Sequence, residues 1–204
     1  SVAEDRASAV FLAWYPGARG GKAVADLLFG KRSPSGKLPV TFYHDEDLAH
    51  LPEFTDYSMK GRTYRYLDRK PLYPFGYGLT YADIRALAAG AEKAADGGLL
   101  VRVQVQNLGA VASEDVVQLY VKAEDSPDST PNPILCGFSR VHLDAGEAKE
   151  VTFSVAPASL SVVDDAGNRI FPGGRYTLYA GTSGPDARSC ELTGVSPVKL
   201  EIRL

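Results

Sequence analysis

Hydrophobic residues occupy every second position in several runs of the C-terminal part of the chain. In residues 99–106, read as LLVRVQVQ, each odd position is Leu or Val. A period of two predicts a β-strand that turns one face toward a core. The same alternation recurs in the runs 117–121, 151–155 and 176–180. Turn sequences rich in Gly, Asn, Asp and Pro separate the strands, at 107–109, 144–146, 165–168 and 172–174.

Short alternating strands joined by such turns predict an antiparallel β-sandwich over residues 83–204, of immunoglobulin or fibronectin type III kind. A true immunoglobulin domain would show a Cys…Trp…Cys pattern, but Trp14 is the single tryptophan and lies far upstream. We therefore expect a mainly β fold, a fibronectin III-like or immunoglobulin-like sandwich without that signature.

The first 45 residues have a different pattern. Residues 9–14 are continuously apolar, which predicts a strand buried on both faces of a parallel sheet. Val24, Leu27 and Leu28 share one helical face, and Gly30 follows as a left-handed terminator. Residues 38–42 form a short extended piece. One strand–helix–strand unit cannot bury both faces of its sheet, so residues 1–45 are predicted to be the remnant of an α/β layer completed elsewhere.

Residues 46–82 carry neither periodicity, and tyrosines are frequent in them. Tyrosine gives a large contact area with a polar tip, so we expect an extended connector that lies against other surfaces. The predicted organisation is thus a remnant at 1–45, a connector at 46–82 and a sandwich at 83–204.

Three motifs follow one another along the first 81 residues. Residues 14–41 contain WYPGARGG, ADLLFG and PSGKLPVT, residues 61–66 read GRTYRY, and residues 71–81 read PLYPFGYGLTY. In order and spacing they resemble the C-terminal half of glycoside hydrolase family 3, the β-glucosidases and β-xylosidases. One position departs from the pattern. Where the family often has Pro-Gly-Gln-Glu-Gly-Gly, this chain has Arg19 in place of Glu, and a helix start favours a carboxylate over a cation.

The resemblance implies a parent enzyme built from a (β/α)₈ barrel, an α/β sandwich and a fibronectin III-like domain. Such enzymes hydrolyse terminal β-linked glucose or xylose with retention, by a barrel Asp nucleophile and a Glu acid/base in an earlier loop. Neither residue has a matching position here, so no catalytic residue is assigned and the chain is expected to be inactive alone. Its partners would be the barrel and α/β domains. A carbohydrate-binding module, a domain-docking module and a structural spacer remain the alternatives.

The candidate substrate-binding residues combine hydrogen-bonding groups with aromatic faces, as sugar sites do. They are Trp14, Arg62, Tyr64, Arg65 and Tyr66. The competing interpretation is that the four connector residues pin the connector to neighbouring domains and that Trp14 belongs to a core.

Other polar clusters favour a structural interpretation. The carboxylates Asp26, Glu53, Asp56 and Asp68 are expected to be solvated. His44 and His50 flank an acidic run, but six residues is not a ligand spacing, so no metal and no cofactor are predicted.

The net charge of −3 and the absence of a dense basic cluster argue against nucleic acid, and no apolar run reaches the length of a membrane span. Cys136 and Cys190 could be free or could form one bridge. The cellular compartment stays open.

Overall fold

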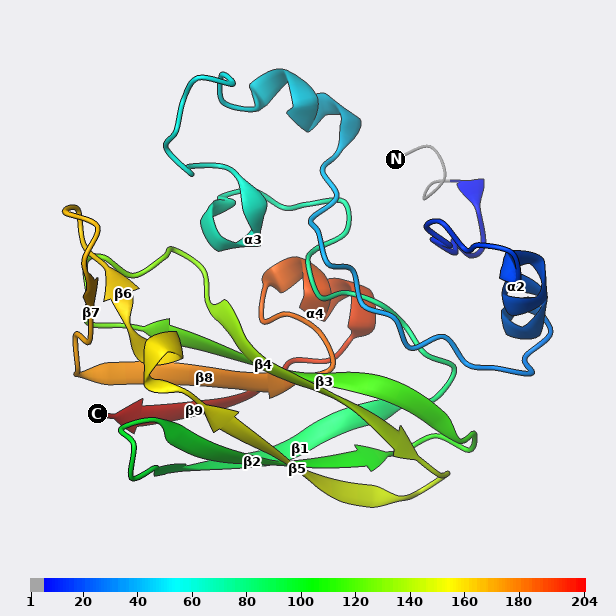
Figure 1. Ribbon diagram of the computed structural model, residues 1–204. Coiled ribbons are helices and arrows are strands. Elements are labelled where there is room, and N and C mark those ends of the chain that lie inside the picture. Colours follow the sequence, from blue (N-terminus) through cyan, green and yellow to red (C-terminus); the bar gives the residue numbers. More distant parts are fainter. Residues whose placement is uncertain (1–5) are drawn as a thin grey trace.

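Two stacked antiparallel sheets form the body of the molecule, shown in Figure 1 as a computed structural model that describes residues 6–204. The first sheet has the order β1-β2-β5: β1 (Ile84–Lys93), β2 (Leu99–Asn107) and β5 (Ala148–Val155). The second has the order β4-β3-β8-β9: β4 (Ile134–Leu143), β3 (Ser113–Ala123), β8 (Arg175–Gly181) and β9 (Val198–Arg203). This arrangement is the predicted β-sandwich.

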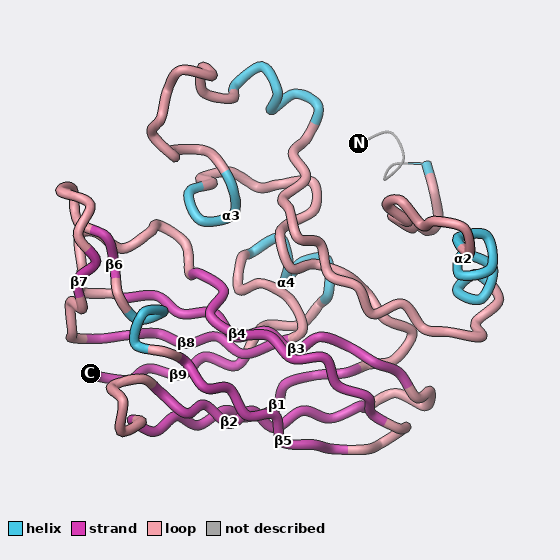
Figure 2. Tube along the Cα trace, in the orientation of Figure 1, coloured by secondary structure: helices cyan, strands magenta, loops and turns pink. Residues whose placement is uncertain are grey.

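Shorter elements surround the sheets. In the N-terminal third lie α2 (Gly20–Leu28), the 3₁₀ turn η1 (Asp45–His50) and α3 (Thr63–Tyr66). The rest comprises η2 (Pro157–Leu160), the two-residue strands β6 (Val162–Val163) and β7 (Arg169–Ile170), and α4 (Ala187–Thr193). Figure 2 shows that most of the chain before β1 is loop.

The core lies between the sheets and is built by the alternating positions. Val101, Val103 and Val105 of β2 are buried while Arg102 and Gln104 face solvent. Each fully buried Val or Leu side chain contributes about 1.5–3 kcal/mol relative to exposure. The alternation seen in the sequence is therefore the main stabilising feature of the sandwich.

All four predicted strand runs are found, within β2, β3, β5 and β8. Three further strands of the two sheets were not among the predicted runs, although β9, VKLEIR, does alternate apolar and charged residues. In β1 the sequence IRALAAGAEK has five Ala or Gly positions, which give little contrast between faces. The β4 and β9 strands lie at opposite edges of the second sheet, where burial is partial.

The predicted strand–helix–strand unit is only partly present. Helix α2 forms, and Gly30 follows it with φ +68°, as expected for a left-handed terminator. The strand predicted at residues 9–14 was wrong, because the backbone there is irregular and no strand of the described chain lies beside it. Residues 38–42 are not a parallel strand either. They pair with the connector through Leu38 N–H to Tyr77 O (2.9 Å) and a single bridge between Phe42 and Tyr73.

Both cysteines are free thiols. Cys136 lies in β4 and donates from Sγ to Leu119 O at 3.3 Å, and burial raises its pKa to about 12. No helix among residues 6–204 is long and apolar enough to cross a membrane.

Candidate functional site

The N-terminal third lies over the outer face of the four-stranded sheet (Figure 1), and a buried ion pair joins the two. Lys37 Nζ lies 2.7 Å from Asp115 Oδ1 of β3, with side chains 9% and 3% exposed. Lys37 also donates to Gly78 O, and Asp115 accepts from Val116 N–H, both at 2.7 Å. Burial raises the pKa of Asp115, and the neighbouring Lys37 ammonium opposes that rise. Such a pair fixes two segments in one register because each charge needs the other.

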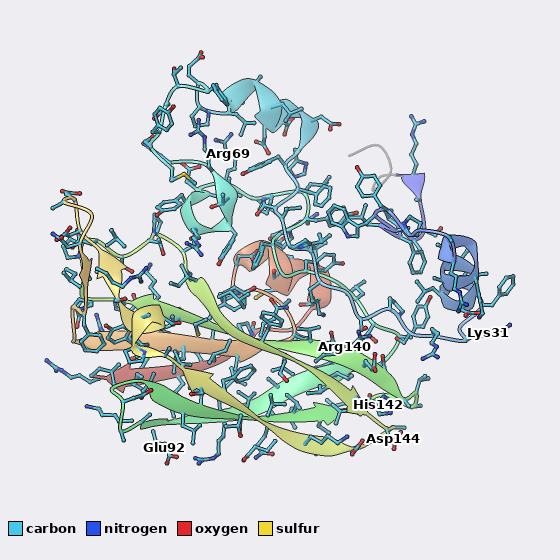
Figure 3. The ribbon with its side chains drawn as sticks, in the orientation of Figure 1. Lys31, Arg69, Glu92, Arg140, His142 and Asp144 are labelled. Carbon is cyan, nitrogen blue, oxygen red and sulfur yellow. The ribbon has the colours of Figure 1, made fainter. Side chains whose placement is uncertain are left out.

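Hydroxyl groups extend this contact on both sides of the ion pair. Thr80 Oγ1 lies 2.7 Å from Ser33 Oγ and 2.5 Å from Ser113 Oγ. Arg140 of β4, labelled in Figure 3, donates to Ser35 Oγ at 2.8 Å. We call the contact of residues 33–42 and 71–81 with β3 and β4 the docking seam.

Gly76 lets the connector approach β3 closely. Its φ is +80°, and an added Cβ would lie 2.4 Å from both Gln118 Oε1 and Tyr120 Oη. Gln118 donates to Gly76 O at 2.9 Å and to Thr182 O at 3.2 Å, and accepts from Tyr120 Oη at 2.7 Å. Gln118 and Tyr120, on the face of β3 opposite to Val117 and Leu119, are therefore buried under the connector.

Tyr64, a predicted substrate contact, has its ring occupied by packing. It stacks on Phe75 with centroids 4.1 Å apart and meets the Tyr120 ring edge-on. Its hydroxyl accepts from Leu135 N–H at 3.1 Å, and Asn132 Nδ2 donates to Tyr64 O at 2.9 Å. These contacts favour the pinning interpretation for this residue.

Arg62 holds a loop together from inside. Its guanidinium donates to the carbonyls of Pro52, Glu53, Asp56 and Ser58. We call residues 51–62 the aromatic loop, after its exposed side chains Phe54 and Tyr57.

The other predicted substrate contacts lie outside the loop that Arg62 holds together. Arg65 is exposed, with its guanidinium 5.8 Å from the Tyr64 ring centre, and Tyr66 is half-buried. Trp14 is half exposed and lies 6.5 Å from Phe42, ring centre to ring centre. The structure thus groups Arg62 to Tyr66 on and beside α3 and leaves Trp14 in the N-terminal segment.

Of the four carboxylates considered earlier, Glu53 is exposed and the other three have local partners. Asp26 pairs with Lys22 at 2.5 Å, and that hydrogen bond lowers its pKa. Asp56 accepts from Ser58, which lowers its pKa, and Asp68 lies 3.7 Å from Arg69 and is largely exposed. None of these is a pair of carboxylates poised in a pocket, as a retaining glycosidase requires.

The acidic run after His44 is a capped turn. Asp47 Oδ2 accepts from His44 N–H at 3.0 Å, and Asp47 Oδ1 lies 3.4 Å from Arg69. Within residues 6–204, no three His, Cys, Asp or Glu side chains gather in a way that could hold a metal ion.

The N-terminal segment carries large apolar side chains that nothing in the described chain covers. Helix α2 buries Gly20 alone, and Leu28 and Phe29 at its end are 62% and 81% exposed. We call this set the N-terminal apolar surface: Val10, Phe11, Leu12, Trp14, Leu28 and Phe29. Several large exposed apolar side chains within one short segment are typical of a contact site.

Lys37, Asp115 and Gln118 were not recognised in the sequence as contact residues. The available signal was a polar residue in or beside an otherwise apolar run. Gln118 interrupts the run 116–121, and Asp115 directly precedes it. A buried strand tolerates such residues only when they have partners.

Comparison with known proteins now adds to this geometry. Residues 1–81 match the glycosyl hydrolase family 3 C-terminal domain, and residues 115–184 match a fibronectin type III-like domain. A xylan 1,4-β-xylosidase of Xylanibacter ruminicola is 42% identical over 192 residues, which are 93% of this chain and 22% of the relative. A periplasmic β-glucosidase of Salmonella typhimurium is 32% identical over 198 residues, 88% of this chain and 25% of the relative.

A solved structure shows the same relation. The β-glucosidase of Streptomyces venezuelae in complex with D-glucose superposes with a TM-score of 0.76 at 34% identity, over 93% of this chain and 25% of that one. The chain therefore spans about a quarter of the length of these relatives. Two family models match consecutive segments of the chain, and the relatives match nearly all of its length. This chain therefore belongs to glycosyl hydrolase family 3, and it corresponds to the C-terminal region of that family together with the fibronectin type III-like domain.

Proposed function

We propose that this chain is the C-terminal structural part of a β-glucosidase or β-xylosidase that releases terminal β-linked sugars with retention. The catalytic carboxylates would come from the remaining three quarters of the parent enzyme. This chain would complete the α/β layer and fix it to the fibronectin III-like sandwich. The functional division would follow the predicted bounds of 1–45, 46–82 and 83–204.

One observation carries the proposal. The N-terminal apolar surface is exposed, while the docking seam holds the following residues, 33–42, to the β-sandwich. Lys37, Thr80 and Gln118 each take part in a polar contact between that segment and the sandwich. The side chains of the N-terminal apolar surface remain exposed in the described residues. An element built this way joins two bodies, one already present and one still to be supplied.

Two members of the predicted substrate set retain groups able to reach a sugar in the parent enzyme. Trp14 is half exposed and Arg65 is exposed, whereas Tyr64 is committed to packing. We propose Trp14 and Arg65 as contacts made through the parent, with Arg62 and Tyr66 as supports of their surroundings.

The proposal is tested by assaying the isolated chain and the full parent enzyme on aryl β-glucosides and aryl β-xylosides. We expect turnover by the parent and none by the chain. Release of the aryl group by the purified chain would contradict the proposal, because the chain would then hold its own catalytic pair. A parent enzyme without glycosidase activity would contradict it from the other side.

A further inference from the structure

The aromatic loop stands out from the rest of the surface. Its residues 51–62 rise above α3, away from both sheets (Figure 1). Phe54 and Tyr57 at its tip are 94% and 89% exposed. In a loop without support, such side chains would be free to collapse onto the nearest apolar surface.

This loop is held open by its own polar contacts. Arg62 ties together four of its backbone carbonyls, as described above. The next residue, Thr63, has φ +52°, which is unfavourable for a β-branched side chain, and its N–H donates to Tyr43 Oη at 3.0 Å. A strained backbone persists when its surroundings hold it, and it marks sites where placement matters. The loop is preorganised, so a ligand need not order it on binding.

The chemistry of the tip differs from that of the N-terminal apolar surface. Residues 9–14 are apolar without interruption, which suits contact with another protein body. At the tip, Phe54 and Tyr57 alternate with Glu53, Thr55 and Asp56, all exposed. A sugar ring presents an apolar C–H face and a rim of hydroxyls, so an aromatic face beside carboxylate and hydroxyl groups complements it.

We propose that the aromatic loop is a saccharide-contacting element, in which Phe54 and Tyr57 pack against sugar units of a β-linked oligosaccharide. Resting on the proposed function, the loop would engage sugars beyond the one being released. It would thereby favour oligosaccharides over substrates with small leaving groups. Arg62 acts as a positioning residue, because it holds the loop and does not itself need to touch the ligand.

The first experiment uses the chain itself. Saturation-transfer NMR is recorded with xylotriose and with cellotriose on the wild type, on the double variant Phe54→Ala/Tyr57→Ala and on Phe138→Ala. Phe138, on β4, is a matched control because it is also exposed, at 70%. We expect saturation transfer from the protein to at least one trisaccharide, which the double variant loses and Phe138→Ala keeps. No transfer from the wild type, or transfer unchanged in the double variant, would overturn the proposal.

The second experiment uses the parent enzyme and separates this inference from the proposed function. For each single variant, Phe54→Ala and Tyr57→Ala, kcat/KM on the trisaccharide should fall roughly two- to tenfold, the size of one aromatic contact. Turnover of aryl β-glycosides should not change. An equal fall on both substrates would overturn the loop's role while leaving the proposed function intact. Inactivity of the wild-type parent would remove the proposed function, and the NMR result would then decide the loop alone.

The hydrogen bonds of Arg62 give a third measurement. Arg62→Met should free the loop and raise the rate at which a lysine-specific protease cuts after Lys60, without change in the far-ultraviolet circular dichroism. The trisaccharide signal should weaken in the same variant. A faster cut with full signal would show that the loop does not need this geometry to bind.

Discussion

The N-terminal apolar surface directly precedes the first segment of the docking seam along the chain, yet the two regions are built by opposite means. In the seam, Lys37 and Asp115 are buried as a pair, and Thr80 and Ser113 are joined by their hydroxyl groups, while the Thr41 hydroxyl is buried without a hydrogen-bond partner. On the apolar surface, Phe29 and Leu28 are exposed and α2 buries no apolar side chain of its own. Buried polar pairs are costly to break and fix orientation, whereas apolar surface gains free energy against any apolar partner.

The two regions differ in whether their contacts are made within this chain. The seam joins residues that all lie within this chain, so it links the connector to the sandwich. The apolar surface is exposed in this chain, and we propose that a further domain of the parent enzyme covers it. The predictions below test whether the two regions differ in stability as their chemistry implies.

Breaking the ion pair of the seam should give the largest effect. Lys37→Ala leaves the Asp115 carboxylate buried without a cation, so we expect a loss of about 3–5 kcal/mol in the free energy of unfolding. Urea denaturation of the chain measures it. The control Lys22→Ala breaks the exposed pair with Asp26 on α2 and should change the unfolding free energy far less, because solvent screens that pair. Similar losses from the two variants would erase the contrast between the regions.

Crowding the seam should have the next largest effect. In Gly76→Ala the new methyl group would meet Gln118 and Tyr120, which should cost roughly 1–3 kcal/mol in unfolding free energy. Gly21→Ala in α2 is the matched control, because a Cβ there meets no atom within 4 Å. Helix propensity predicts that this control gains up to about 1 kcal/mol. Thermal and urea unfolding of both variants would show whether close approach is confined to the seam.

Titration of two aspartates should sharpen the comparison. Burial raises the pKa of Asp115, so its stabilising contribution is full below pH 3.8 and is lost as pH rises through its folded pKa. The Lys22 hydrogen bond lowers the pKa of Asp26, so its contribution is present above pH 3.8 and is lost as pH falls through its folded value.

Carboxyl-carbon NMR of both residues measures these midpoints. Lys37→Met should move the Asp115 midpoint further up, since it removes the opposing charge, and should leave Asp26 unchanged. A downward shift of Asp115 in that variant would contradict the assigned balance of burial and charge.

The apolar surface should respond least. Replacing both exposed residues, as Leu28→Gln with Phe29→Gln, should change the unfolding free energy of the isolated chain by less than about 0.5 kcal/mol. The same change should reduce the self-association of the chain, measured by light scattering. It should also lower the stability of the parent enzyme, where we propose that this surface is covered. A large loss of stability in the isolated chain would mean that α2 already packs there.

Periodicity predicted the sandwich well because a strand with one buried face has apolar residues at alternate positions. The runs in β2 and β5 show this directly, as Val101, Val103, Val151 and Phe153 are all buried. The same logic failed for β1, where Ala and Gly blur the two faces, and for residues 9–14, where the apolar run is exposed and forms no strand in the described chain.

The candidate site was less accessible to sequence reasoning. Arg62 and Tyr64 were singled out by type, yet nothing along the chain could show that one braces a loop and the other stacks between Phe75 and Tyr120. Lys37 lies 78 positions before Asp115, so their pairing exists only once the connector lies on β3. Motifs located the segments that matter without saying what each side chain touches.

The sequence by itself determined the strands of the sandwich, the turns between them and the family to which the motifs are similar, because these depend on local pattern and on short runs of residue types. Tertiary structure alone decided that β3 is covered on both faces, that a lysine and an aspartate are buried together, and that Phe54 and Tyr57 are held out in solvent. Those features depend on contacts between segments far apart along the chain, and such contacts leave no period in the sequence.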